Sequence, residues 1–440
     1  MEGVPWSRVL PRTRRRRMLV LATIAIMLMT TSKLLMSTTR DVQFQNNDFI
    51  SSYLIRRESE VDNLTEGILY KIFSPSAIKT KMDAVEQGLS WLRSAPPRPP
   101  QVKHRNLSFI ERNFFSSMVQ KQICDQYEVE GKMNRTTITK IWHKFNKYAP
   151  DDVTMTVHLS VAKLDILDLL LSHWHGPVSI AVDIKLLETD VFLSKLRTNF
   201  KHWASRDNID FHFVRNDGKF YSPNYLRQVA LNNVETRYVF LNDVDFIPQS
   251  KLYNELRNHR ELVNRAKNVY VVAAFEYLTI PDSMPNTKSK LLQEWDRRNI
   301  QPFHYRPNDA TYGHRATDYK KWVYATDSYQ ATWEMYYEPY IFGEASQLPD
   351  YDVRFLGRYF DKISFLDTLA ATGFNFTVLP DVFIIHYLHP VHLDVTYTEC
   401  AEDLYHDIHL AKIRRLWLLA RGVEPPEDLY TRAKPPRRKG

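Results

Sequence analysis

Short apolar segments alternate with segments of helical periodicity from residue 151 onward. The first kind predicts strands, and the second, with apolar residues three or four positions apart, predicts helices. The expected strands are 153–161, 178–184, 209–214, 238–241 and 269–275, and the expected helices are 163–175, 190–203, 223–234 and 251–267. Such alternation is typical of an α/β domain with a mostly parallel sheet between layers of helices. Ligands of these sheets bind beyond the carboxyl ends of the strands.

The scarcity of glycine excludes the common glycine-based nucleotide sites. Only 12 of the 440 residues are glycine, which is under half of the usual share of about 7%. No two glycines lie within five residues of each other. The chain therefore contains neither the dinucleotide fingerprint G-x-G-x-x-G nor a Walker loop. A diphosphate bound by this chain needs a metal ion or side chains instead.

The formal net charge of +8 does not indicate a nucleic-acid-binding protein. Residues 1–17 contribute +5 and residues 421–440 contribute +3, so residues 18–420 sum to zero. A protein that binds nucleic acid carries its positive charge on the folded body. We therefore expect no nucleic-acid partner and interpret 421–440 as a basic C-terminal tail.

An apolar segment near the amino terminus predicts a membrane anchor. Residues 18–36 are nineteen residues long and mostly apolar, which is just enough to span a bilayer with Lys33 near the far end. The basic residues 1–17 before it predict a cytoplasmic tail and a luminal or extracellular remainder. A cleaved signal peptide is the alternative, although no clear A-x-A cleavage site follows the apolar run.

Residues 37–150 lack the strand–helix alternation and predict a luminal stem. A proline cluster at 95–100 is typical of a spacer, and 109–148 is apolar enough to pack as helices against the next domain. Three of the four N-x-[ST] sequons lie in this stretch, and we expect glycosylation there. They are Asn63, Asn106 and Asn134. The fourth, at Asn375, falls in an expected strand, which disfavours modification.

The chain has two cysteines, Cys124 and Cys400. This number excludes a disulfide-rich scaffold and a zinc site built from four cysteines. The two residues flank the region that we expect to carry the chemistry, within a catalytic domain over 151–420. A disulfide that joins the ends of this region and two unpaired buried thiols are both compatible with the sequence.

An Asp-x-Asp pair, Asp243 and Asp245, directly follows the expected strand 238–241. Two carboxylates at this spacing can bind one hard cation, which would bridge the oxygens of a nucleotide diphosphate. Chance supplies about one such pair in a chain of this length, and a second pair occurs at Asp350 and Asp352. That second pair lies in an expected loop. The position of the first at a strand end therefore favours it as the functional pair.

A phosphatase of the haloacid dehalogenase type is an alternative, because it also uses Asp-x-Asp after a strand. That class requires Thr or Val two residues after the second Asp and places the motif early in the fold. Here the position is Ile247, and three expected strands precede the motif.

Two strand-like segments, 376–379 and 382–385, lead to His386. His389 and His392 follow, but Pro390 and the lack of helical periodicity disfavour a three-histidine zinc site. One imidazole combined with two carboxylates gives an oxygen-rich site that suits manganese. We therefore predict that His386 joins Asp243 and Asp245 as metal ligands.

Several motifs in the same order resemble glycosyltransferase family 49. They are residues 220–230, 238–246, 313–322, 333–334, 338–340 and 378–386. The resemblance extends over about residues 151–395. It implies a GT-A fold, a type II Golgi membrane topology, dependence on Mn2+ and transfer from a UDP-sugar, which is UDP-glucuronate in the known members.

The resemblance also implies roles for individual residues. Asp243, Asp245 and His386 match the metal ligands of the family, while Asn224 and Arg227 match a motif that faces the donor. An inverting transfer needs a carboxylate base near the acceptor hydroxyl; the candidates are Glu334, Glu338 and Asp361, with Glu338 preferred. A glucuronate donor needs a cation. The basic residues at hand are Arg227, Arg315, Lys321 and Lys362, although each could instead be an ordinary surface residue.

One motif departs from the family. Members carry Gly-Trp-Asn-Lys or Gly-Phe-Asn-Arg where this chain reads Tyr359-Phe360-Asp361-Lys362. The added carboxylate of Asp361 disfavours a glucuronate donor nearby, unless Asp361 pairs with Lys362 or Arg358 and leaves the donor unaffected.

Together these features predict a Mn2+-dependent Golgi glycosyltransferase that moves a sugar from a UDP-sugar, with UDP-glucuronate as the expected donor, onto a glycan or glycoprotein acceptor. The alternative is a catalytically inactive protein of the same fold that serves as a binding or chaperone subunit, for which Tyr359 and Asp361 are the best support. Association with a second copy or another subunit stays open.

Overall fold

The computed structural model describes residues 75–94, 112–143, 147–259, 267–279, 283–306, 313–389 and 396–426. The expected anchor, the sequons at Asn63 and Asn106 and most of the C-terminal tail lie outside these residues. Within the described part of the chain, no helix is both long enough and apolar enough to cross a membrane. Asn134 is described and exposed, so its glycosylation stays a prediction compatible with its position.

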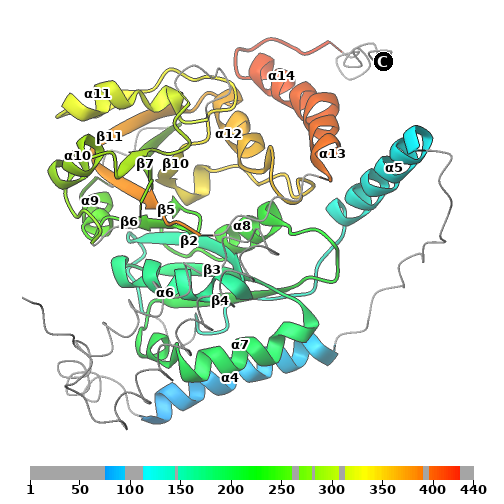
Figure 1. The fold of residues 1–440 in the computed structure, drawn as a ribbon, viewed down its shortest axis with the longest axis vertical. Helices are drawn as coiled ribbons and strands as arrows, with labels where there is room; N and C mark the ends of the chain where they lie inside the picture. The colour runs from blue at the N-terminus through cyan, green and yellow to red at the C-terminus, as the bar shows by residue number, and fades with distance from the viewer. Residues whose placement is uncertain are drawn as a thin grey trace, which may run out of the picture. The chain divides into compact units, whose positions relative to one another are not determined.

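A mixed sheet lies at the centre of the fold (Figure 1). One half consists of four parallel strands in the order β4–β3–β2–β5. They are β2 (Val153–Ser160), β3 (Val178–Ile184), β4 (Ile209–Arg215) and β5 (Tyr238–Leu241). Nearly all of their residues are buried, and strands buried on both faces form continuous apolar runs. The predicted bounds of these four strands are therefore confirmed to within one residue.

The other half of the sheet makes it mixed, whereas the sequence predicted a mostly parallel sheet. Strand β10 (Tyr340–Glu344) lies antiparallel between β5 and β7 (Asn268–Tyr277). Strand β11 (Asn375–His386) is parallel to β7, and β6 (Phe246–Pro248) is antiparallel to β11. The four longest ladders are still the parallel ones.

Short strands and one irregularity complete the sheet. The short strands are β1 (Thr137–Ile138) beside β4, β8 (Ile300–Pro302) beside β7 and β9 (Tyr329–Gln330) beside β11. The two segments predicted as separate strands near 376–385 form one strand, β11, whose register against β7 shifts between Val378 and Phe383. This shift explains why the apolar pattern breaks there.

Helices cover both faces of the sheet (Figure 1). Those that follow the first strands are α6 (Leu164–His173), α7 (Thr189–Thr198), α8 (Pro223–Asn232) and α9 (Leu252–His259). Those of the second half are α10 (Lys288–Asp296), α11 (Tyr319–Tyr324), α12 (Asp361–Ala371), α13 (Thr398–Asp403) and α14 (Leu410–Leu419). Pro223 occupies the first turn of α8, as predicted, because its missing N–H is unpaired there in any case.

Part of the stretch expected as stem belongs to the core. Helix α4 (Pro75–Ser94) runs alongside α7 in Figure 1 and buries Val85, Leu89 and Leu92 completely or nearly so. These side chains join the same apolar cluster as Trp142 and Phe211. Each buried aliphatic side chain of this kind contributes about 1.5–3 kcal/mol of transfer free energy, so α4 is an integral part of the folded domain.

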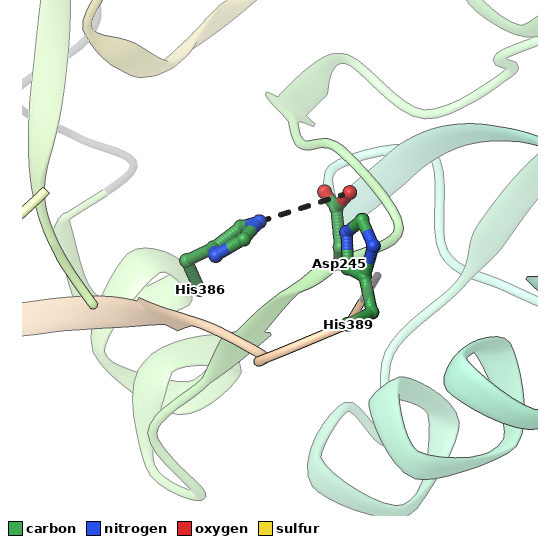
Figure 2. A group of neighbouring side chains, drawn as sticks. All are labelled: Asp245, His386 and His389. Atoms are coloured by element: carbon green, nitrogen blue, oxygen red, sulfur yellow. Dashed lines mark ion pairs between the residues drawn. The ribbon is translucent and has the colours of Figure 1, made fainter. Parts of the chain in front are cut away.

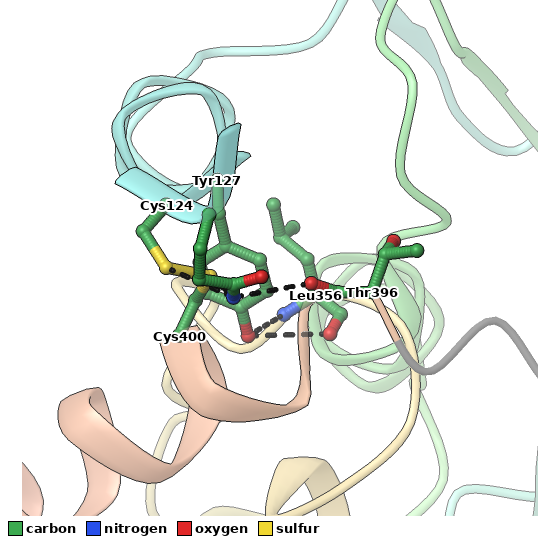
Figure 3. Close-up of a disulfide and its surroundings, with 6 residues drawn as sticks. Cys124, Tyr127, Leu356, Thr396 and Cys400 are labelled. Atoms are coloured by element: carbon green, nitrogen blue, oxygen red, sulfur yellow. Dashed lines mark hydrogen bonds between the residues drawn. A yellow bond between two sulfur atoms is a disulfide. The ribbon is translucent and has the colours of Figure 1, made fainter. Parts of the chain in front are cut away.

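A disulfide links Cys124 on α5 (Arg112–Gly131) to Cys400 on α13 (Figure 3). This settles the choice between a disulfide and free thiols that the sequence left open. Beside it, the Tyr127 hydroxyl donates to the carbonyl of Leu356 at 3.2 Å and accepts from the N–H of Leu356 at 2.9 Å. Helix α5 is thereby attached to the loop that precedes α12.

Glu130, at the end of α5, fixes the loop that precedes α8. Its buried carboxylate accepts hydrogen bonds from the N–H groups of Lys219 at 2.8 Å and Phe220 at 3.0 Å. A Cβ at Gly218 would collide with this carboxylate, so the close approach requires glycine. The amino-terminal end of α8 is held in this way at the carboxyl edge of the parallel strands.

Candidate active site

A tight turn presents the two carboxylates of the Asp-x-Asp pair. Strand β5 ends at Leu241, and the next residue, Asn242, donates its amide to the carbonyl of Phe246 at 2.8 Å. The N–H of Phe246 in turn donates to the carbonyl of Asp243 at 3.0 Å. The chain therefore reverses into β6 at the carboxyl edge of the sheet, the place where α/β folds bind their ligands.

Asp243 is surrounded by donors. Its Oδ1 accepts from Arg227 Nη2 at 2.9 Å, and its Oδ2 accepts from the Tyr340 hydroxyl at 2.9 Å and from Lys362 Nζ at 3.2 Å. Burial alone would raise the pKa of the Asp243 carboxyl, but the Lys362 and Arg227 cations hold this pKa well below its ordinary value. Asp243 is therefore ionised at neutral pH.

Arg227, on α8, is the cation that connects this carboxylate to α12. Its Nη1 donates to Asp361 Oδ2 at 2.7 Å and to Asn224 Oδ1 at 3.0 Å, while Nη2 reaches Asp243. Burial opposes the charge of Arg227, yet Asp243 and Asp361 keep its pKa well above the ordinary value. The sequence offered Lys362 or Arg358 as the partner of Asp361; the structure pairs it with Arg227 instead.

Asn224 has no exposed surface and ties α8 to α12. Its amide nitrogen donates to the backbone carbonyls of Asp352 at 3.0 Å and Asp361 at 2.8 Å, and its oxygen accepts from Arg227. The sequence predicted Asn224 and Arg227 as donor-facing residues. The structure gives Asn224 a positioning contact with Arg227, and it places Arg227 beside the Asp-x-Asp pair.

Asp245 meets the histidine that ends β11. His386 Nε2 lies 4.0 Å from Asp245 Oδ2, and the two side chains point toward each other in Figure 2. One ligand atom from each of Asp245, His386 and His389 lies within 4.8 Å of the other two. Lys163 Nζ also donates to Asp245 Oδ2 at 2.7 Å. Asp245, His386 and His389 therefore lie close enough together to share one ion, although the sequence disfavoured His389; their ligation of a metal stays a prediction.

This donor set fits a divalent transition metal. A carboxylate combined with imidazoles is a set that first-row ions such as Mn2+ and Fe2+ accept, whereas Mg2+ and Ca2+ prefer oxygen ligands alone. The carboxylate of Asp243 is engaged by Arg227, Tyr340 and Lys362, whereas Asp245 is the aspartate that lies near His386 and His389. Direct ligation by Asp243 stays a prediction.

The three candidate bases lie in different environments. Glu334 accepts from Arg315 Nε at 2.7 Å, and Asp361 pairs with Arg227. The carboxylate of Glu338 has no hydrogen bond or ion pair to any described residue. Burial raises the pKa of Glu338 to about 7, a rise that nearby Lys362 limits. A carboxyl that titrates near neutral pH suits general base catalysis.

The basic residues proposed for a donor carboxylate do not gather at one point. Lys362 contacts Asp243 and lies 3.8 Å from the centre of the Tyr340 ring. Arg315 pairs with Glu334, and Lys321 is exposed on α11, where its Nζ lies 4.4 Å from the centre of the Tyr329 ring. Lys321 is thus separate from the group around Asp243.

Sequence reasoning missed three residues of the site. His158, within β2, lies with Nε2 3.3 Å from Asp243 Oδ1, and its Nδ1 is hydrogen-bonded to the Tyr221 hydroxyl at 2.7 Å. A histidine inside an apolar strand was a usable signal for it, and Tyr340 falls within a motif that was recognised. Lys163 has no such local signal, because only the folded sheet brings it to Asp245.

The sequence profile of one protein family matches residues 152–220 and 214–389, over half of the chain, and this family is described as "Glycosyl-transferase for dystroglycan". Mouse (Mus musculus) xylosyl- and glucuronyltransferase LARGE2 is 36% identical over 293 residues, which are 64% of this chain and 42% of that protein. Human (Homo sapiens) LARGE1 is 33% identical over 299 residues, 65% of this chain and 39% of that protein. The chain spans about two fifths of the length of these relatives.

Solved structures resemble the fold more distantly. A crystal structure of GalNAc-T7 with UDP, GalNAc and Mn2+ has a TM-score of 0.39 and 11% identity, and the match covers 77% of this chain and 66% of that one. A crystal structure of S. aureus TarS has a TM-score of 0.34 and 11% identity, with 64% and 71% of the two chains covered.

Proposed function

We propose that this chain, which belongs to the family described as "Glycosyl-transferase for dystroglycan", is a metal-dependent glycosyltransferase. Its donor is a UDP-sugar and its acceptor is a glycan or glycoprotein. The observation that carries the proposal is the meeting of Asp245 with His386 at the carboxyl edge of the sheet. Asp245 follows the end of strand β5. The other aspartate of the pair, Asp243, is held ionised by Arg227 and Lys362.

The proposal assigns the metal to Asp245, His386 and His389, with Mn2+ as the expected ion. When bound, it would neutralise the charge of a diphosphate leaving group. Arg227 and Lys362 keep Asp243 ionised, and the Tyr340 hydroxyl fixes its orientation. Lys163 balances the charge of Asp245.

Glu338 is proposed as the general base. It would accept the proton of the acceptor hydroxyl as that oxygen attacks the anomeric carbon of the donor. The bond from this carbon to the diphosphate would break on the opposite face, so that UDP leaves and the configuration inverts. Glu338 forms no ion pair with a described residue, which supports this role over Glu334 and Asp361, each of which is paired with an arginine. We further propose the Golgi membrane as the location, with residues 18–36 as a type II anchor.

Family resemblance alone points to UDP-glucuronate as the donor, and the relatives' names include both xylosyl and glucuronyl transfer. The test is release of UDP by the full-length chain from a panel of UDP-sugars, measured with Mn2+ and with EDTA. We expect release that is lost with EDTA and in Asp245→Asn but kept in Asp350→Asn, a matched aspartate of the other Asp-x-Asp pair. Full Mn2+-dependent turnover by Asp245→Asn would refute the metal assignment.

If no UDP-sugar is turned over, the alternative to test is the catalytically inactive binding or chaperone subunit. Binding of UDP to the same preparation, with and without Mn2+, then separates two cases. Tight metal-dependent binding without turnover of any donor would support a binding subunit. Release of phosphate from a generic phosphomonoester would instead support the phosphatase.

A further inference from the structure

The guanidinium of Arg227 is already occupied by carboxylates of the chain itself. Asp361 Oδ2 lies 2.7 Å from its Nη1 and Asp243 Oδ1 lies 2.9 Å from its Nη2, so one carboxylate binds at each prong of the fork. The amide oxygen of Asn224 takes a further contact at Nη1. All of these side chains are at least four-fifths buried, so water does not screen the pairs strongly.

The other cations that contact this cluster are paired as well. Lys362 binds Asp243 at 3.2 Å, and Lys163 binds Asp245 at 2.7 Å. Three cationic side chains thus face three aspartates, and the formal charges of this described cluster cancel. A sugar with its own carboxylate binds best to a free arginine fork, which presents two parallel N–H groups. Here such a sugar would have to displace Asp361.

Displacement of Asp361 is costly, because the aspartate would then be left without a cation. Asp361 begins α12, and its backbone carbonyl accepts from Asn224 at 2.8 Å, so the residue is held in place by its main chain as well. An uncharged sugar needs only hydrogen bonds and leaves the Arg227–Asp361 pair intact.

We infer that the donor sugar is uncharged and that Asp361 is the residue that selects it against a uronic acid. This inference rests on the proposed function and names its substrate class. Asp361 acts as an internal substitute for the carboxylate of a uronate on Arg227. The resemblance alone would have assigned UDP-glucuronate.

The test compares two donors that differ at one group. UDP-glucose carries CH2OH where UDP-glucuronate carries a carboxylate, so their affinities isolate the charge of the sugar. Both are titrated into the full-length chain by calorimetry with Mn2+, with free UDP as reference. We expect UDP-glucose to bind at least ten-fold more tightly than UDP-glucuronate.

Substitution of Asp361 provides the decisive step. Asp361→Asn keeps the size of the side chain but frees the charge of Arg227, and a hydrogen bond between charged groups corresponds to about a ten- to hundred-fold change in affinity. We expect the preference for UDP-glucose to shrink by such a factor or reverse. Asp350→Asn is the matched control: Asp350 accepts from Gln228 on the same helix α8 at 2.8 Å, and its loss should leave the preference unchanged.

The outcomes separate the two proposals. Equal ratios of the two affinities in wild type and Asp361→Asn, or tighter binding of UDP-glucuronate by the wild type, would overturn the role of Asp361 while leaving the transferase intact. Binding of neither UDP nor either donor by the wild type would overturn the proposed function, and this inference with it. Affinity for free UDP reports whether Asp361→Asn is folded, and Asp361→Ser serves as a second variant if it is not.

Discussion

Replacement of Arg227 by methionine should strongly destabilise the fold. The side chain of Arg227 is 11% exposed, and its partners Asp243 and Asp361 are each 19% exposed. Asp243 would keep Lys362 and Tyr340, but Asp361 would lose its cation. Removal of one partner from a buried ion pair costs about 3–5 kcal/mol, because the other charge is left uncompensated. We expect Arg227→Met to lower the free energy of unfolding by that amount.

Most of this loss in the free energy of unfolding should come from the unpaired charge of Asp361, and a double variant tests this. In Arg227→Met with Asp361→Asn the unpaired carboxylate is gone, so the double variant should be more stable than Arg227→Met by about 2 kcal/mol. The matched control is Arg237→Met. Arg237 pairs with Glu344 at 3.1 Å but is 48% exposed, and exposed pairs contribute about 0–1 kcal/mol.

The assay is urea denaturation of the full-length chain, followed by circular dichroism at several pH values. The lowered pKa of Asp243 stabilises the wild type at pH values above the ordinary carboxyl value, and this stability is lost as the pH falls through the folded pKa. The difference in unfolding free energy between wild type and Arg227→Met should therefore narrow as the pH falls below the ordinary carboxyl value of 3.8. A double variant no more stable than Arg227→Met, or a difference independent of pH, would refute the reasoning.

Three further predictions concern the base, a strained residue and the disulfide. Burial raises the pKa of Glu338 to about 7, and a base must be ionised, so the rate of UDP release should rise with pH through about 7. The rate should fall at least 100-fold in Glu338→Gln. A rate that does not change between pH 8 and pH 5 would exclude Glu338 as the base. Tyr359 has a φ of +73°, so Tyr359→Gly should be about 1 kcal/mol more stable than Tyr359→Ala in urea; the reverse order would mean that the backbone is not strained there. Replacement of Cys124 and Cys400 together by serine should lower the free energy of unfolding by about 2–5 kcal/mol, and an unchanged urea midpoint under non-reducing conditions would show that the link does not constrain the unfolded chain.

The parallel half of the sheet could be predicted from the sequence because its signal is local. The segments 178–184 and 238–241 are short and mostly apolar, as strands buried on both faces are. Gly176 and Pro177 precede the first and Asn242 follows the second, and these turn residues together with the short length favour strands over helices. Strand β10 was missed. It is five residues long, follows Pro339, and runs antiparallel between β5 and β7, an arrangement set by its neighbours in the sheet rather than by its own pattern.

The candidate site likewise contains residues that local sequence patterns reveal and contacts that they do not. Asp243 and Asp245 were recognisable because they follow a strand end, and His386 because it ends another. The pairing of Asp361 with Arg227 joins residues 134 positions apart, and Lys163 reaches Asp245 over 82 positions. No local pattern encodes such contacts, since they depend on how α8, α12 and the sheet meet in space.

The bond between Cys124 and Cys400 closes the intervening residues into a covalent ring. The chain enters and leaves this ring at α-carbons only 5.2 Å apart, although 276 positions separate them in the sequence. Once α4 has been pulled away from the core, tension between the two chain ends passes through the sulfur–sulfur bond, and the backbone between Cys124 and Cys400, which includes Asp243 and His386, is bypassed. A single backbone cut inside the ring likewise leaves both pieces joined until the bond is reduced.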